Sequence, residues 1–169
     1  VVISQSGETL DTMAALREAK SLGARILSIV NVVGSSIARE SDDVLYTWAG
    51  PEIAVATTKA YSTQMAVLDL LAIYLAGQRK TITAEDMRRL TSAIAALPAQ
   101  VEQILSNREQ IQYYASQYFN HDSVFFIGRN LDYALGMEGS LKLKEISYIH
   151  SEAYASGELK HGTISLIEP

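Results

Sequence analysis

The sequence predicts an α/β fold in which parallel sheets carry helices on both faces, with a helical linker between a truncated first domain and a truncated second domain. Short β-branched runs alternate with helix-like segments in the first half of the chain, and the alternation restarts near residue 122. The region between is helical and richer in Gln, Glu and Arg. Alternating strands and helices are typical of a parallel sheet covered on both faces. We therefore expect a first domain over 1–80, a linker over 81–121 and the start of a second domain over 122–169.

Strands and helices alternate before residue 80. Strands are expected where β-branched residues cluster, and the first helix where leucine and methionine recur at helical spacing up to Gly23. The expected segments are a strand over 1–4, a helix over 10–22, a strand over 25–30, a loop or short helix over 31–43, a strand over 44–48 and a long helix over 57–75. The long helix is apolar nearly all round, which predicts that it is buried.

The linker and the second alternation contain the remaining elements. Thr83 with its following acidic residues resembles a helix N-cap, and Pro98 marks a helix restart because proline is tolerated in the first turn. We expect one helix to about residue 96, a second to about 119, a strand over 123–127, a turn over 128–130 and a helix over 133–149.

The composition excludes several kinds of site and partner. The 169 residues include no cysteine, which rules out disulfides and thiolate sites and fits a reducing, cytoplasmic location. A formal net charge of −5 argues against nucleic acid or an anionic membrane as a partner. The longest apolar run, 65–75, falls short of the about 20 residues that span a membrane. The three histidines are widely spaced and form no metal motif. Both ends are apolar, which we interpret as cuts through a larger protein.

A hydroxyl-rich loop, Ser4-Gln5-Ser6-Gly7-Glu8-Thr9, lies between the first expected strand and helix. Free backbone N–H groups and the helix dipole favour an anion at such a place. The hydroxyls can donate to phosphate oxygens, and Gly7 allows close backbone approach. The loop lacks the lysine of a nucleotide-binding loop, which favours a sugar phosphate over a triphosphate. The alternative interpretation is a serine-rich turn that only caps the helix.

A second loop, 49–59, follows the third expected strand. Gly50-Pro51 forces a turn, and small residues lead to a helix that starts at the threonines. Ligands bind at the carboxyl ends of strands in open α/β sheets, so this loop is a candidate binding element. A plain turn with a helix cap explains the same residues.

Two further candidates lie in the last third of the chain. Glu138, Lys142 and Glu145 are spaced by four and three residues and therefore share one helical face. A carboxylate beside a lysine could move a proton between adjacent carbons, although a solvated salt-bridge ladder has the same spacing. The stretch 155–162 places His161 between glycines, where it could act as an acid–base group or simply lie on the surface.

Together these stretches resemble the isomerase half of the glucosamine-6-phosphate synthases, which are glutamine-dependent fructose-6-phosphate aminotransferases. The matching text is SQSGET at 4–9, AGPEIAVATTKAY at 49–61, GR at 128–129 and EGSLKLKEISYIHSEAYASGELKHG at 138–162. SQSGET alone marks the wider sugar-isomerase (SIS) fold, whereas LKLKEISYIH with GELKHG is more specific. The resemblance covers nearly the whole chain. It implies a tandem pair of flavodoxin-like SIS domains.

The resemblance also implies the binding residues. The SQSGET loop would hold the 6-phosphate of fructose 6-phosphate or glucosamine 6-phosphate, and the loop after the third strand would contact the sugar. The implied phosphate ligands are Ser4, Gln5, Ser6 and Thr9, and the implied sugar contacts are Val55 and Thr57. The family commonly has serine at position 57, and threonine keeps the hydroxyl while adding a methyl group.

The resemblance assigns the chemistry to three further residues. Glu145 would move the proton between C1 and C2, with Lys142 assisting, and Glu138 is implied only as support. His161 would help to open the sugar ring from the neighbouring subunit of a homodimer. The reaction joins fructose 6-phosphate with ammonia from glutamine and needs no metal or organic cofactor. The glutaminase domain, a further phosphate-binding serine and a Schiff-base lysine of the family are not in this sequence. We therefore expect little turnover from these residues alone.

Two other functions fit the same loops. A stand-alone SIS deaminase or deglycosylating enzyme would use them without a glutaminase domain. A regulator that senses phosphosugars would keep the phosphate loop but would not need Glu145 or His161.

Overall fold

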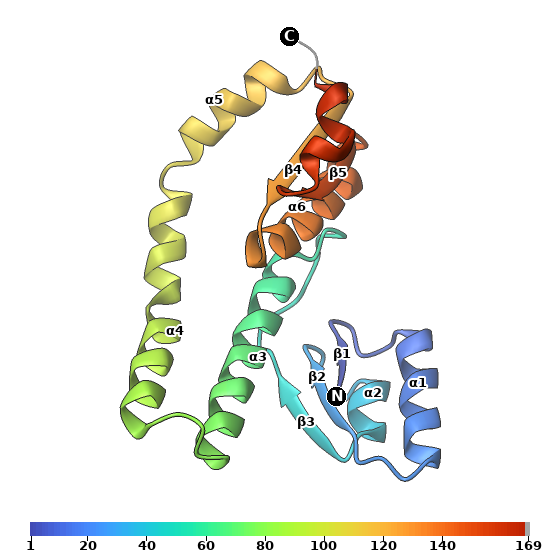
Figure 1. Ribbon diagram of the computed structural model, residues 1–169. Helices are drawn as coiled ribbons and strands as arrows, with labels where there is room; N and C mark the ends of the chain where they lie inside the picture. Colours follow the sequence, from blue (N-terminus) through green and yellow to red (C-terminus); the bar gives the residue numbers. More distant parts are fainter. Residues whose placement is uncertain (168–169) are drawn as a thin grey trace. The chain divides into compact units, whose positions relative to one another are not determined.

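Parallel β-strands with intervening helices form both ends of the chain, and the computed structural model describes residues 1–167. The described residues divide into two units, Val1–Glu102 and Gln103 onward (Figure 1). Within residues 1–167, no helix is both long and apolar enough to cross a membrane.

The first unit contains a three-stranded parallel sheet in the order β1-β2-β3. Its first elements are β1 (Val2–Ser4), α1 (Leu10–Ser21), β2 (Leu27–Val30), α2 (Ser36–Glu40) and β3 (Asp43–Tyr46). The strand order advances in one direction, so right-handed connections place α1 and α2 on the same face. This arrangement confirms the predicted alternation, with strands shorter than the sequence suggested.

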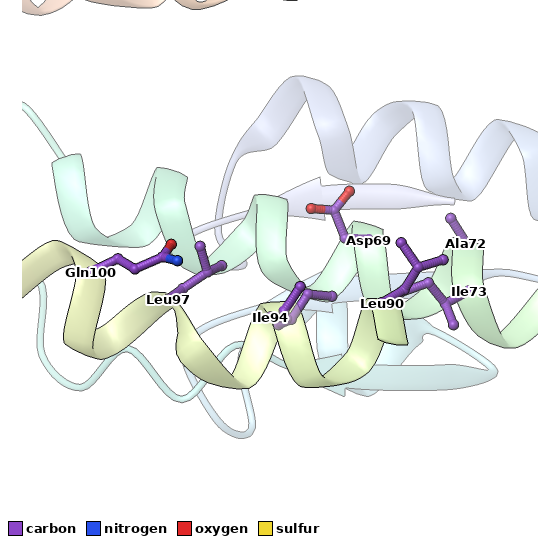
Figure 2. Close-up of a pocket in the computed structure, with 8 residues that line it drawn as sticks. Asp69, Ala72, Ile73, Leu90, Ile94, Leu97 and Gln100 are labelled. Carbon is purple, nitrogen blue, oxygen red and sulfur yellow. The ribbon is translucent and has the colours of Figure 1, made fainter. Parts of the chain in front are cut away.

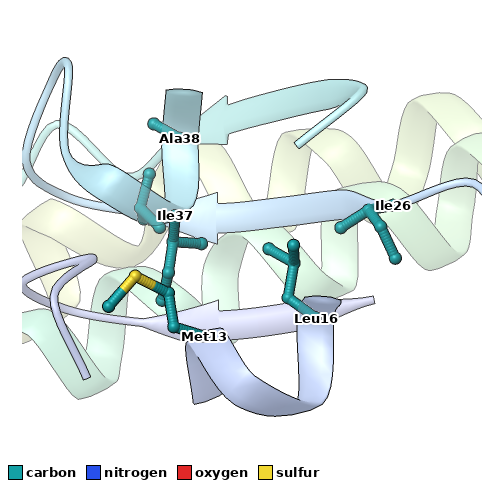
Figure 3. Close-up of a cluster of buried hydrophobic side chains, with 6 residues drawn as sticks. Met13, Leu16, Ile26, Ile37 and Ala38 are labelled. Carbon is teal, nitrogen blue, oxygen red and sulfur yellow. The ribbon is translucent and has the colours of Figure 1, made fainter. Parts of the chain in front are cut away.

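The core of the first unit lies between that face of the sheet and the two helices. Met13 and Leu16 from α1 meet Ile37 and Ala38 from α2 over the sheet, together with Ile26 and Val30 (Figure 3). Ile29 and Val30 are both fully buried, although neighbouring side chains of a strand point to opposite faces. Both faces of β2 are therefore covered.

Two long helices complete the first unit: α3 (Thr58–Gln78) and most of α4 (Ala84–Leu105). The prediction that the long helix is buried is wrong. Only Ala60 of α3 is buried, whereas Tyr74 and Leu75 are about half exposed. The reason is that an apolar helix is buried only where another layer covers it, and α4 meets α3 along an open groove.

The predicted helix restart at Pro98 is also wrong. α4 continues through Pro98, and the helix ends instead before Ser106-Asn107. Proline removes only one N–H from the helical ladder, and an exposed helix tolerates this at a cost of about 3 kcal/mol. At the break, the Ser106 hydroxyl donates to the Gln103 carbonyl at 2.7 Å and the Asn107 amide donates to Gln110 Oε1 at 2.6 Å. These local bonds compete with the helical ladder and end it.

The second unit is a β-α-β element preceded by a helix. It contains α5 (Arg108–Tyr118), β4 (Ser123–Gly128), α6 (Leu131–Ser147) and β5 (His150–Ala155), followed by two short 3₁₀ turns, Leu159–His161 and Thr163–Leu166. β4 and β5 pair in parallel, with α6 packed on both. β5 was not among the strands expected from the sequence. Ser151 of β5 is fully buried, and its hydroxyl donates to the carbonyl of Ser140 in α6 at 2.8 Å.

Two glycines of α6 allow a sharp stability test. A Cβ at Gly139 would lie 2.9 Å from Cε1 of Phe126, whereas a Cβ at Gly136 would lie 3.5 Å from the Phe126 Cβ. Gly139→Ala should therefore destabilise the second unit by about 1–3 kcal/mol through overpacking. Gly136→Ala should stabilise it by about 0.5–1 kcal/mol, because alanine favours the helix. Amide hydrogen exchange of α6 and β4 measures both, and equal effects of the two variants would contradict the packing described.

Candidate functional site

The β1–α1 loop folds so that its hydroxyl groups gather at the start of α1. Ser4 Oγ accepts the N–H of Gly7 at 3.0 Å and lies 2.8 Å from the hydroxyl oxygen of Thr9, while Ser6 Oγ accepts the N–H of Glu8 at 3.2 Å. Thr9 occupies the N-cap position of α1 but makes no side-chain cap bond. The first-turn N–H groups of a helix have no intrahelical partner. Hydroxyls and free N–H groups thus meet at the positive end of the helix dipole, a suitable environment for an anion.

Gly7 is required by the shape of this loop. Its φ is +68°, a left-handed conformation that costs glycine little. A Cβ at this position would lie 2.0 Å from Ser35 Oγ. The Ser35 hydroxyl is buried and has no hydrogen-bond partner among the described residues. The loop therefore lies directly against the turn that precedes α2.

Glu8 attaches the β1–α1 loop to α2. Its Oε1 accepts the backbone N–H of Ser36 at 2.8 Å, and the carbonyl of Gly7 accepts the N–H of Ile37 at 2.9 Å. The hydrogen bond from the Ser36 backbone lowers the pKa of Glu8 below its usual value of 4.5. Sequence analysis did not single out Glu8. The signal was the Gly34-Ser35-Ser36 turn, which places free N–H groups at the start of a helix.

This contact predicts a pH-dependent stability. Because folding lowers the Glu8 pKa, ionised Glu8 stabilises the fold above pH 4.5, and that stabilisation is lost as the pH falls through the folded-state pKa. Glu8→Gln should unfold at a lower temperature than wild type at pH 7, with the two melting temperatures converging as the pH falls through the lowered folded-state pKa of Glu8. Glu18→Gln in α1 is the matched control, because the Glu18 carboxylate makes no ion pair among the described residues. A melting-temperature difference for Glu8→Gln that stays constant with pH would contradict this role.

The β3–α3 loop holds the two predicted sugar contacts, Val55 and Thr57. The Val55 side chain is 89% exposed. Thr57 caps α3 in a left-handed conformation with φ 57° and donates its hydroxyl to the carbonyl of Val55 at 2.8 Å. A β-branched residue is strained in this conformation, and such strain concentrates at functional sites. The loop therefore presents an apolar side chain beside a fixed hydroxyl.

One face of α6 carries the cluster of Glu138, Lys142 and Glu145, as their spacing predicted. Lys142 Nζ donates to Glu145 Oε2 at 2.9 Å and lies 3.4 Å from Glu138 Oε1. The Lys142 side chain is 19% exposed, and those of Glu138 and Glu145 are 24% and 30% exposed. The hydrogen bond to Glu145 raises the pKa of Lys142. Lys142 therefore stays protonated at neutral pH and holds Glu145 by charge and hydrogen bond, while leaving that carboxylate accessible.

His161 lies apart from this cluster. It is exposed and ends the 3₁₀ turn Leu159–His161, where its backbone N–H donates to the Glu158 carbonyl at 2.9 Å. No hydrogen bond or ion pair of the described residues joins it to Lys142 or Glu145. The residues of the β1–α1 loop belong to the first unit, and the α6 cluster and His161 belong to the second.

A separate apolar groove of about 440 Å³ lies between α3 and α4 (Figure 2). Its lining contains one carboxylate, Asp69, and otherwise mainly aliphatic side chains such as Ile73, Leu90 and Ile94. It includes none of the predicted site residues. Across residues 1–167, no cluster of His, Asp or Glu has the geometry to hold a metal ion.

Comparison with known proteins identifies relatives over almost the whole chain. It is 61% identical over 167 residues to a glutamine–fructose-6-phosphate aminotransferase (isomerizing) of Symbiobacterium thermophilum, and 56% identical over 168 residues to the one of Clostridium acetobutylicum. Each match covers 99% of this chain but only 27% and 28%, respectively, of the relative. The chain therefore spans little more than a quarter of the length of these proteins.

A solved structure agrees with these relatives. The C-terminal domain of glucosamine-fructose-6-phosphate aminotransferase from Francisella tularensis superimposes with a TM-score of 0.94 at 41% identity, covering 98% of this chain and 47% of that one. The family model for the SIS domain matches residues 1–74 and 117–169, which leaves out the helical middle. Both sheets, the hydroxyl-rich loop and the α6 cluster fall within these matched residues. The chain belongs to the SIS domain family.

Proposed function

We propose that this chain is the isomerase region of a glutamine–fructose-6-phosphate aminotransferase, which converts fructose 6-phosphate and ammonia into glucosamine 6-phosphate. The observation that carries the proposal is the hydrogen-bonded pair of Lys142 and Glu145, because a phosphosugar binder needs no paired acid and base. The identity of 55–61% to five aminotransferases bearing that name supports the choice of reaction.

The phosphate loop supplies binding energy. Ser4, Gln5, Ser6 and Thr9 are the proposed ligands of the 6-phosphate, joined by the first-turn N–H groups of α1. Hydrogen bonds to a charged group contribute about 1.5–3 kcal/mol each, more than those between neutral groups. Val55 and Thr57 are the proposed contacts of the sugar.

The proton transfer belongs to the second unit. After ammonia has replaced the C2 oxygen and water has left, Glu145 removes a proton from C1 and returns it to C2. The C1 hydroxyl loses its proton and the imine nitrogen gains one, so the ketose-derived imine becomes the amino aldose glucosamine 6-phosphate. Lys142 remains protonated and orients Glu145. His161 is the proposed acid–base group that opens the sugar ring, as part of a homodimer.

Ammonia comes from a glutaminase domain of the same polypeptide in this proposal. We place the reaction in the cytoplasm, because charged hexose phosphates do not cross membranes unaided. The domain boundaries that we propose are 1–80, 81–121 and 122–169.

The two other functions receive less support. A phosphosugar sensor does not explain the Lys142–Glu145 pair. A deaminase would use the same acid–base chemistry, but the solved glucosamine-6-phosphate deaminase of Thermotoga maritima is only 24% identical, and that likeness concerns the fold alone.

Calorimetry on the intact protein tests the proposed function. Fructose 6-phosphate should bind, and unphosphorylated fructose should bind at least about 100-fold more weakly, because it lacks several charge-assisted hydrogen bonds. Glucosamine 6-phosphate should compete for the same site. Equal affinity for fructose and fructose 6-phosphate would contradict the proposal.

A further inference from the structure

Asn31 connects the two loops that follow neighbouring strands. It is the first residue after β2, whose last residue, Val30, pairs with Ser4 of β1 and Tyr46 of β3. The β1–α1 loop and the β3–α3 loop therefore begin on either side of Asn31, at the carboxyl edge of one sheet. Neither the sequence motifs nor the acid–base chemistry gives this residue a role.

Every strong polar contact of Asn31 goes to one of these loops. Its backbone N–H donates to the carbonyl of Gln5 at 3.1 Å. Its side-chain Oδ1 accepts the hydroxyl of Thr47 at 3.0 Å and the N–H of Ala49 at 2.8 Å. Its Nδ2 donates to the carbonyl of Gly50 at 2.8 Å.

The contacts fix the orientation of the amide without ambiguity. The Ala49 N–H can only donate and the Gly50 carbonyl can only accept, so Oδ1 must face the first and Nδ2 the second. Only an amide side chain of this length supplies an acceptor and a donor to adjacent peptide groups. Asn31 is half-buried and Thr47 is buried, so these bonds are partly shielded from competing water.

We propose that Asn31 is a positioning residue that sets the spacing between the phosphate-binding loop and the sugar-contacting loop, and thereby the preference for a hexose phosphate over inorganic phosphate. The proposal rests on the proposed function. Asn31 touches no substrate in this account. It acts through the turn at 47–50, which leads to Val55 and Thr57, while its backbone contact secures Gln5.

Loss of the Asn31 side chain should weaken binding of the sugar part of the ligand and leave binding of the phosphate part nearly unchanged. In Asn31→Ala, the backbone bond to Gln5 remains, so the phosphate loop keeps its shape. The 47–50 turn loses three hydrogen bonds, and the sugar contacts shift. Misplacement of a ligand contact by about 1 Å can cost on the order of 100-fold.

Binding of two probes to the intact protein tests the proposal. Asn31→Ala should weaken the binding of fructose 6-phosphate by about 10–100-fold and the binding of inorganic phosphate by no more than about threefold. Thr47→Val removes one hydrogen bond to Asn31 Oδ1. It should lower the ratio of the affinity for fructose 6-phosphate to that for inorganic phosphate by about two- to tenfold. The double variant should resemble Asn31→Ala, because the Thr47 hydroxyl acts through Asn31. Asn107→Ala is the control, since the Asn107 side chain bonds Gln110 in the second unit and should change neither affinity.

The outcomes separate this inference from the proposed function. An equal loss for both probes shows a merely structural role and overturns the inference, as does an unchanged affinity ratio. If Asn31→Ala does not fold, an unchanged ratio in Thr47→Val overturns it on its own. A wild-type protein that binds fructose 6-phosphate no better than fructose contradicts the proposed function instead.

Discussion

Replacing Glu145 by glutamine in the intact protein should lower kcat for conversion of fructose 6-phosphate to glucose 6-phosphate by about 10²–10⁴-fold, the usual contribution of a general base. Glutamine keeps the size of the side chain and can still accept the hydrogen bond from Lys142, but it cannot take a proton from carbon. Binding of fructose 6-phosphate should therefore remain within about threefold of wild type, so the loss falls on kcat and not on KM.

Glu138→Gln is the matched control for this prediction. Glu138 shares the face of α6 and the same lysine, but it lies 3.4 Å from Lys142 Nζ, whereas Glu145 makes a 2.9 Å hydrogen bond. The two residues are about 10 Å apart along the helix axis, at 1.5 Å per residue, but both carboxylates reach Lys142 Nζ, so the comparison of the two variants and not distance decides between them. Near-normal turnover in Glu145→Gln, or a larger loss in Glu138→Gln, would make the assignment wrong.

Replacing Ser6 by alanine should weaken fructose 6-phosphate binding by about 1–3 kcal/mol, which is about fivefold to more than 100-fold. Ser6 Oγ accepts the N–H of Glu8, so its own hydrogen is free to donate to a phosphate oxygen. The loop itself should persist, since Gly7 and Glu8 remain bonded to Ile37 and Ser36.

Calorimetry with two ligands measures this loss. Ser21→Ala at the other end of α1 is the control, because the Ser21 hydroxyl only bonds the Glu18 carbonyl in its own helix. Binding of unphosphorylated fructose should be the same in wild type and Ser6→Ala. Wild-type affinity of Ser6→Ala for fructose 6-phosphate would remove Ser6 from the phosphate site.

The local patterns predicted most of the fold because each element has a local cause. β-Branched runs and Gly23 mark β1, β2 and the end of α1, and the 3-and-4 spacing of Glu138, Lys142 and Glu145 suffices to place them on one face. The prediction that α3 is buried failed because burial depends on which other elements cover a helix. Hydrophobic periodicity does not encode that information. β5 was missed because its sequence, HSEAYA, contains no β-branched residue. α4 passes through Pro98 because one lost hydrogen bond does not end an exposed helix.

The candidate site was predictable only in its named motifs. The hydroxyls of the β1–α1 loop lie close together in the sequence, as do the charged residues of the α6 cluster. Their chemistry can therefore be predicted from the sequence. Glu8 and Asn31 act across 28 and 18 residues of chain, on Ser36 and Ala49, and nothing local distinguishes them from ordinary polar residues. Parallel strand pairing brings these partners together, and pairing is a property of the folded sheet.

Product analysis with the intact protein tests the central claim most directly. The protein is supplied with fructose 6-phosphate and glutamine, and the sugar products are identified by mass spectrometry. We expect glucosamine 6-phosphate and glutamate in equal amounts, with product formation about 10²–10⁴-fold slower in Glu145→Gln. Binding of fructose 6-phosphate with no glucosamine 6-phosphate formed, or product formation at a near-wild-type rate in Glu145→Gln, would contradict this expectation.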